Sequence, residues 1–182
     1  MSRFMYHGTN NAIGVISLDK CRLRTDFGKG FYLTDSIETA KNWAARRLAA
    51  VGGVATVVRY EVSDDVYKLS GRRFETVPSL EWLEFIVMNR KRKSKGAPEC
   101  EPRHSYNWVS GPIANDKIAS VVEDYLTGDI TADEAVTLAR ALPQVFQLSL
   151  HTNAALSIIN EECVSIRQYI SSKWSNDWML RK

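Results

Sequence analysis

The sequence predicts an α+β protein that folds as a single domain over residues 1–182. Segments whose apolar residues alternate, as in a strand, are interspersed without a fixed order among segments whose apolar residues recur at helical spacing. Hydrophobic residues make up 45% and charged residues 25% of the 182 positions, which is the balance of one globular domain with a substantial core. No internal repeat and no linker-like stretch divides the chain.

Four segments are predicted to be β-strands. Short strands are expected over residues 4–6 and 30–34. Residues 54–62 alternate clearly, with valine, threonine and tyrosine on one face and charged side chains on the other. Residues 145–151 form the only late strand that we expect. Its phenylalanine and two leucines share one face, which leaves Gln147 on the outward face.

Capping residues and apolar spacing predict helices between these strands. A side-chain oxygen at a helix start satisfies a free backbone N–H, and glycine or proline after the last turn ends the helix. The segment that follows Ser79 has a wide apolar arc and should be well buried. The expected starts, with the stops where they are marked, are Asp35 with Gly52, Ser79, Asn115 or Asp116 with Gly128, Thr131 with Pro143, and Thr152 for a last helix.

Composition and charge indicate which partners, metal sites and cellular location to expect. A net charge of +3 does not by itself call for a nucleic-acid partner. The three cysteines lie far apart, so we expect free thiols, and without a Cys/His cluster we expect no metal site. The start of the chain has no apolar signal-like run, and the longest apolar stretch, around residues 49–58, is too short to span a bilayer. We therefore expect a soluble, cytoplasmic protein with no membrane partner.

Two segments have residue types suited to holding a planar, polar ligand. They are His7-Gly8-Thr9 and Asp26-Phe27-Gly28-Lys29-Gly30-Phe31-Tyr32-Leu33-Thr34. Glycine lets the backbone turn tightly or approach a ligand closely. Tyr32 offers a flat face for stacking, and His7 offers a directional hydrogen bond. Taken singly, His7 is also explained as a partly buried histidine tied to the backbone, and the second segment as a glycine-rich turn beside a core tyrosine.

Together the two segments resemble the nicotinamide-binding half of the ADP-ribosyltransferase superfamily, in particular its poly-ADP-ribose-polymerase-like His-Tyr-Glu clade. The resemblance implies a split β-sheet core with flanking helices, and NAD as substrate. It also implies that His7 hydrogen-bonds the adenosine ribose, that the Gly8 backbone pairs with the nicotinamide amide, and that Tyr32 stacks on nicotinamide. The residues that it assigns to NAD binding are His7, Gly8, Thr9, Gly28, Gly30, Phe31 and Tyr32.

The third catalytic position departs from the clade, which has a glutamate there. On the late strand the resemblance points to Gln147, with Gln144 as a weaker alternative. Glutamine exchanges hydrogen bonds with a ribose hydroxyl but cannot act as a base. The implied catalytic residues are therefore His7, Tyr32 and Gln147. This His-Tyr-Gln arrangement, with its flanking segments, is similar to a bacterial and phage-associated subgroup of toxin-like proteins.

Two further sets of residues have both a structural and a functional interpretation. Asn115 and Asp116 either cap a helix or line the cleft, where Asp116 would supply the acid missing at Gln147. A basic run is either a solvated loop or a contact for the phosphates of a nucleic acid or for an acidic partner. Its cations are Arg90, Lys91, Arg92, Lys93 and Lys95.

The resemblance implies a mono-ADP-ribosyltransferase, which cleaves the nicotinamide–ribose bond of NAD and transfers ADP-ribose to a macromolecule. The acceptor is expected to be RNA, DNA or protein. The toxin-like subgroup implies a bacterial toxin or defence effector, with an antitoxin as a neutralising partner. Two alternatives stay open: an NAD glycohydrolase that uses water as the acceptor, and a non-catalytic module that binds NAD or ADP-ribose.

Overall fold

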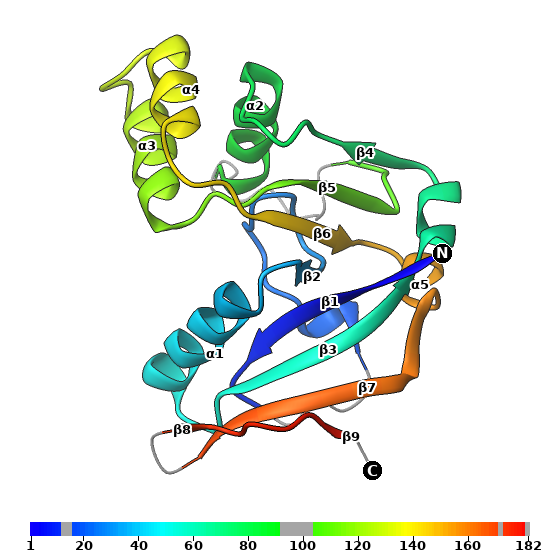
Figure 1. The fold of residues 1–182 in the computed structure, drawn as a ribbon. Helices are drawn as coiled ribbons and strands as arrows, with labels where there is room; N and C mark the ends of the chain where they lie inside the picture. Colours follow the sequence, from blue (N-terminus) through cyan, green and yellow to red (C-terminus); the bar gives the residue numbers. More distant parts are fainter. Residues whose placement is uncertain (12–15, 92–103, 171–172, 181–182) are drawn as a thin grey trace.

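The computed structural model describes residues 1–11, 16–91, 104–170 and 173–180, with the backbone alone at 160–165 and 180. Its strands are β1 (Ser2–Thr9), β2 (Phe31–Thr34), β3 (Thr56–Ser63), β4 (Gly71–Arg73), β5 (Trp108–Pro112), β6 (Phe146–Leu150), β7 (Ile159–Ile170), β8 (Lys173–Trp174) and β9 (Met179–Leu180). Its helices are α1 (Ile37–Val51), α2 (Leu80–Arg90), α3 (Asp116–Thr127), α4 (Ala132–Arg140) and α5 (Asn153–Leu156), with short 3-10 helices at Leu18–Lys20 and Asp64–Lys68. Strands and helices alternate irregularly around a largely antiparallel sheet, as the predicted α+β class requires (Figure 1). No helix in the described part of the chain has the length and apolar character needed to cross a membrane.

The strands form a sheet that separates between β1 and β2. Their order is β4-β5-β6-β2-β1-β3-β7, and the short strands β8 and β9 both pair with β7. Neighbouring strands are antiparallel, except for the parallel pair β4 and β5. β1 pairs with β3 along its whole length, from Ser2 to Thr9, whereas its register with β2 joins Tyr6 to Thr34 alone among the described residues. The two halves of the sheet therefore diverge after Tyr6.

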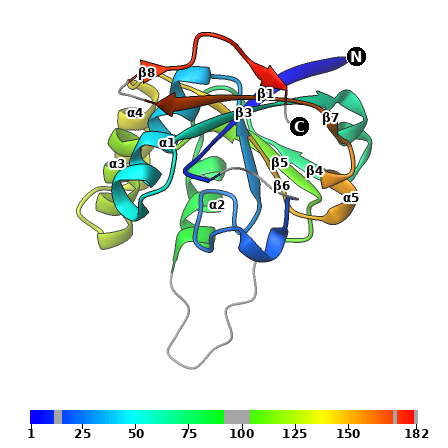
Figure 2. The same ribbon diagram turned by 90° about the horizontal axis from the view of Figure 1, so that it is seen from below.

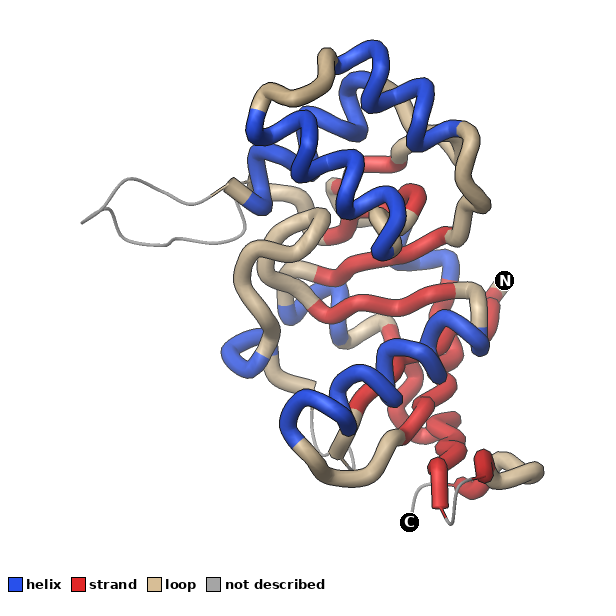
Figure 3. The backbone as a smooth tube through the Cα atoms, turned by 90° about the vertical axis from the view of Figure 1, so that its left-hand side faces the viewer, coloured by secondary structure: helices blue, strands red, loops and turns tan. Residues whose placement is uncertain are grey.

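Two groups of helices cover the two halves of the sheet. α1 packs Ala40 and Ala44 against Ala55 and Val57 at the start of β3. The helices α2, α3 and α4 gather over the β5–β6 end, where their apolar side chains pack with Phe27. A third apolar cluster joins β1, β2, β3, β5 and β6 on the other face of the sheet, since it contains Val58 where the α1 cluster contains Val57. The tube view shows the two helix groups at opposite ends of the sheet (Figure 3), and the view from below shows β7 and β8 at a margin away from α2 (Figure 2).

Gly8 in β1 is required by the packing of α1. A Cβ atom at this position would lie 2.0 Å from the carbonyl oxygen of Ala40, a separation that no pair of non-bonded atoms tolerates. Glycine therefore lets the helix approach the strand closely. This close approach holds one wall of the gap between β1 and β2 in place.

Most of the predicted helix ends are confirmed. The confirmed N-caps are Ser79, Asn115, Thr131 and Thr152, and the confirmed stops are Gly52 and Gly128. The prediction that Asp35 caps the first helix is wrong, because Ser36 is the residue immediately before the helix and its side chain accepts from the N–H of Thr39 at 3.1 Å. The last predicted helix, α5, has four residues, and β7 follows it.

Five strands were not predicted, namely β4, β5, β7 and the short β8 and β9. All five residues of β5 are buried, so its polarity does not alternate as that of a half-exposed strand does. β7 is specified by pairing with β3, whose Thr56 lies opposite Gln168. Pairing between strands that are distant in the sequence produces no recognisable pattern within the residues of β7 itself. The expectation that residues 145–151 form the only late strand is therefore wrong.

Candidate active site

A cleft of about 980 Å³ opens where β1 and β2 diverge. Its volume lies at the upper end of the range for small-molecule and cofactor sites. Its walls come from β1, β2 and β6, from α1, from the segment 16–26, and from the ends of α2 and α3. The cleft brings together most of the residues predicted for the site: His7, Gly8, Thr9, Gly30, Phe31, Tyr32 and Gln147.

His7 reaches across the divergence and is held as a neutral ring. Its Nδ1 lies 2.8 Å from the carbonyl oxygen of Tyr32, which can only accept, so the proton is on Nδ1. The ring also stacks on Phe31, with 4.6 Å between the centroids. Burial lowers the pKa of His7, although the bond to Tyr32 opposes that shift. This tautomer makes Nε2 a hydrogen-bond acceptor.

Tyr32 lines the cleft, while its hydroxyl forms hydrogen bonds with backbone groups inside the protein. The hydroxyl donates to the carbonyl of Gly28 at 2.7 Å and accepts from the N–H of Phe27 at 2.9 Å. Burial, followed by the nearby Asp26 carboxylate, raises the pKa of Tyr32 far above its ordinary value. Gly28 has a φ of 84°, in the left-handed region, and it forms the turn behind Tyr32 instead of the cleft wall.

Replacing Tyr32 by phenylalanine keeps the ring and removes only the hydroxyl. The carbonyl of Gly28 and the N–H of Phe27 then lose a partner in a buried turn, so we expect the free energy of unfolding to fall by about 1–3 kcal/mol. Urea unfolding measures this change, with Tyr169→Phe at an exposed tyrosine as the control. Equal stability of the two variants would contradict a structural role of the hydroxyl.

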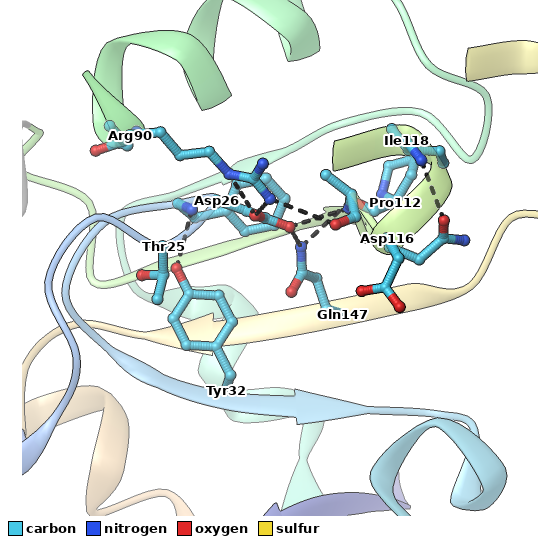
Figure 4. Close-up of polar contacts among 12 residues, drawn as sticks. Thr25, Asp26, Tyr32, Arg90, Pro112, Asp116, Ile118 and Gln147 are labelled. Atoms are coloured by element: carbon cyan, nitrogen blue, oxygen red, sulfur yellow. Dashed lines mark hydrogen bonds and ion pairs between the residues drawn. The ribbon is translucent and has the colours of Figure 1, made fainter. Parts of the chain in front are cut away.

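Gln147 has an acidic neighbour in the cleft wall, Asp26 (Figure 4). The Nε2 of Gln147 donates to Asp26 Oδ2 at 2.8 Å and to the carbonyl of Pro112 at 3.3 Å. Arg90 donates to Asp26 Oδ1, from Nη2 at 2.5 Å and from Nε at 3.1 Å, and the N–H of Ala114 donates to Oδ2 at 3.0 Å. Asp26 is 8% exposed and Gln147 is 5% exposed. A buried ion pair therefore lies directly beside Gln147.

Both faces of β6 are buried, so the face predicted as outward is a second internal face. Gln147 shares it with Ser149 and His151, and all three side chains are buried. The Nδ1 of His151 donates to the carbonyl of Lys29 at 2.8 Å, and its Nε2 lies 2.8 Å from the Ser149 hydroxyl, which is also within 3.1 Å of the Val109 carbonyl oxygen. Burial lowers the pKa of His151 to about 4. His151 is thus a neutral core residue.

Asn115 and Asp116 lie at the start of α3, as its N-cap and its first residue. The Oδ1 of Asn115 accepts from the N–H of Ile118 at 3.2 Å, which is the capping interpretation of this residue. Asp116 does line the cleft, but it forms an ion pair with Arg46 of α1 and its side chain is 69% exposed. Its carboxylate therefore contributes to the mouth of the cleft.

The acid beside Gln147 is Asp26, which sequence reasoning missed as a site residue. The available signal was its place at the first position of the glycine-rich segment, directly before the fully buried Phe27. Gln144, the weaker alternative to Gln147, lines a separate and smaller pocket. There its Nε2 donates to carbonyls at the end of α4, at 2.7 Å.

Of the basic run, the structure describes Arg90 and Lys91. Arg90 is the last residue of α2, its side chain is 22% exposed, and its guanidinium group holds Asp26 in the cleft wall. Lys91 follows as the exposed C-cap residue. The other cations of the run, Arg92, Lys93 and Lys95, lie outside the described residues. Arg90 thus belongs to the cleft and not to a solvated loop.

The cleft is rich in positive charge. Besides Arg90, the cations that line it are Lys20, Arg22, Arg24 and Arg47. Both lining acids, Asp26 and Asp116, are in ion pairs with arginines. Within the described part of the chain, no group of three or more His, Cys, Asp or Glu side chains is placed to hold a metal ion. The chemistry of the lining favours an anionic organic ligand.

Comparison with known proteins connects the chain to one family. A family model described as "Protein of unknown function (DUF3990)" matches residues 4–160. This range includes His7, Tyr32 and Gln147, together with Asp26 and Arg90 beside them. No curated protein and no solved structure matches the chain. Because the family model covers well over half of its length, the chain belongs to the DUF3990 family.

Proposed function

We propose that this protein is an NAD-dependent mono-ADP-ribosyltransferase with a split-sheet fold of the ADP-ribosyltransferase type. The observation that carries the proposal is the cleft between β1 and β2, because it unites His7, Tyr32 and Gln147 from three strands. These are the three catalytic positions that the sequence resemblance implies. A cleft of about 980 Å³ that is rich in cations also suits a dinucleotide with a negative pyrophosphate.

Each of the three residues has a role that its surroundings support. The neutral His7 accepts a hydrogen bond from a hydroxyl of the adenosine ribose through Nε2. The ring of Tyr32 provides a stacking face for nicotinamide. Gln147 binds a hydroxyl of the ribose that carries nicotinamide. The residues thereby orient the dinucleotide and stabilise the positive charge that develops on this ribose.

In the proposed reaction the bond between nicotinamide and ribose breaks, and its electron pair leaves with nicotinamide. An oxygen or nitrogen atom of the acceptor then forms the new bond to the same ribose carbon and releases its proton to solvent. The acceptor is a macromolecule of the cytoplasm: RNA, DNA or protein. Trp43 of α1 supports a nucleic acid, because it is 39% exposed at the cleft and offers a face on which a base can stack.

A biological role is proposed with the activity. The similarity to a toxin-like subgroup favours a bacterial toxin or defence effector, which an antitoxin would neutralise. Binding of such a partner over the mouth of the cleft, where Arg46 and Asp116 pair, would block access to NAD.

The test uses purified protein, NAD labelled on its adenylate side, and a cell lysate separated into protein, RNA and DNA fractions. Label that moves to one fraction identifies a transferase and the class of its acceptor. Nicotinamide release without transferred label identifies an NAD glycohydrolase. NAD that binds but stays intact identifies a non-catalytic binding module.

We expect His7→Ala and Gln147→Ala each to lower the rate of nicotinamide release by about 10²- to 10³-fold, because each removes a hydrogen bond that orients NAD at the transition state. The measurement is release of nicotinamide at saturating NAD. Arg72→Met is the control, since Arg72 pairs with Glu81 away from the cleft lining. A full rate in either cleft variant would exclude that residue from the reaction.

A further inference from the structure

We propose that Asp26 is a positioning residue. With Arg90, it holds the side-chain amide of Gln147 in one orientation, with Nε2 turned into the protein and Oε1 presented to the cleft as a hydrogen-bond acceptor. The orientation follows from the contacts of these residues. The further statement that Oε1 accepts a hydrogen bond from a ribose hydroxyl rests on the proposed function.

The orientation of the amide is decided by the chemistry of its neighbours. One end of a glutamine amide only donates and the other only accepts. The two hydrogen-bond partners of Nε2 are the Asp26 carboxylate oxygen at 2.8 Å and the Pro112 carbonyl oxygen at 3.3 Å, and both are acceptors. A reversed amide would put Oε1 against both of them and lose two hydrogen bonds. The close-up shows Oε1 directed away from Asp26, on the side of Tyr32 (Figure 4).

The carboxylate of Asp26 is itself held firmly. Arg90 binds Oδ1 through two nitrogen atoms, and Oδ2 receives the N–H of Ala114 as well as Gln147. These four donors occupy the acceptor sites of a carboxylate, so Asp26 is not available as a general base. Its negative charge instead polarises the Gln147 amide and makes Oε1 a better acceptor.

This arrangement requires a glutamine at position 147. A glutamate there would bring a carboxylate oxygen to about the position of Nε2, against the Asp26 carboxylate and a carbonyl, with no proton between them. Gln147→Glu is therefore expected to be at least tenfold less active than the wild type. A protein in which glutamine merely stood in for a lost glutamate would gain activity from the same change.

The first test needs no substrate. In ¹⁵N-labelled protein, the side-chain amide signal of Gln147 is identified by its disappearance in Gln147→Glu. We expect its protons to exchange with water at least tenfold more slowly than those of the exposed Asn42, and to lose most of this protection in Asp26→Asn. Fast exchange in the wild type would overturn the proposal, whatever the protein does with NAD.

The second test separates positioning from a loss of structure. Asp26→Asn is expected to lower kcat for nicotinamide release at least tenfold while KM for NAD changes little, because Oε1 acts mainly at the transition state. The double variant Asp26→Asn/Gln147→Glu restores a donor–acceptor pair and should be more active than either single variant. Its recovery is incomplete, because the N–H of Ala114 then loses its acceptor. A double variant no more active than the single variants would overturn the proposal.

If the wild type releases no nicotinamide, the proposed function fails. The exchange measurement alone then decides whether Asp26 positions Gln147.

Discussion

Replacing Arg90 by methionine is expected to lower the free energy of unfolding by about 3–5 kcal/mol, because it leaves the buried carboxylate of Asp26 without its cation. Methionine retains much of the aliphatic length of arginine, so the loss reports the charge and its hydrogen bonds more than the packing. Urea unfolding followed by tryptophan fluorescence measures the change, since the chain has five tryptophans.

Arg72→Met is the matched control for this prediction. Arg72 also pairs with a carboxylate, that of Glu81, but the Glu81 side chain is 66% exposed, so we expect a change below about 1 kcal/mol. Adding Asp26→Asn to Arg90→Met removes the unpaired charge and should restore part of the stability. Equal losses in the Arg90 and Arg72 variants would contradict a special contribution of the largely buried Arg90–Asp26 ion pair to stability.

Acid is expected to destabilise the protein through His151, by about 3 kcal/mol between pH 6.5 and pH 4. The pKa of His151 is lowered to about 4 in the folded protein, whereas an unfolded histidine titrates near 6.5. Above pH 6.5 both states hold a neutral ring, so His151 adds no pH dependence. As the pH falls below 6.5 the unfolded chain takes up a proton that the folded protein does not, and the free energy of unfolding decreases until the folded pKa is reached.

Urea unfolding at a series of pH values measures this dependence, in the wild type and in His151→Gln. The variant lacks the titrating ring. The slope of its free energy of unfolding against pH should therefore be smaller between pH 6.5 and pH 4, by the equivalent of up to one proton taken up on unfolding. His7→Gln is measured in parallel, because burial also lowers the pKa of His7 and makes a separate contribution of the same sign. A slope unchanged by His151→Gln would contradict a neutral, buried His151.

Local sequence signals predicted the helix boundaries well. Thr131 and Glu134 form the reciprocal capping box that their spacing predicts, and Gly128 adopts the left-handed conformation that ends α3. These features depend on hydrogen bonds between residues a few positions apart, so the sequence specifies them wherever the segment lies in the fold. Alternation also predicted β3 and β6, because one face of each contacts the apolar core that joins the strands.

The strands without a local sequence signal could be identified only from the tertiary structure. β5 is covered on both sides, so its burial does not alternate. β7 follows the short α5 and exists through its pairing with β3, which is distant in the sequence. The predicted last helix does begin after Thr152, but it ends after four residues, and β7 follows it.

The candidate site likewise combines features that the sequence predicts with features that only the structure shows. The sequence by itself determined the local chemistry: a histidine in β1, a glycine-rich segment that leads into Tyr32, and a glutamine on β6. Only the tertiary structure decided that Asp26 and Arg90 stand beside Gln147, and that Asp116 pairs with Arg46 at the mouth of the cleft instead. Asp26 and Gln147 are 121 positions apart. They meet because β2 and β6 are neighbours in the sheet and because the segment before β2 folds back over Tyr32, whose hydroxyl bonds Phe27 and Gly28. Hydrogen-bonding capacity is a property of each residue, but which donor meets which acceptor across such a distance is set by the order of the strands.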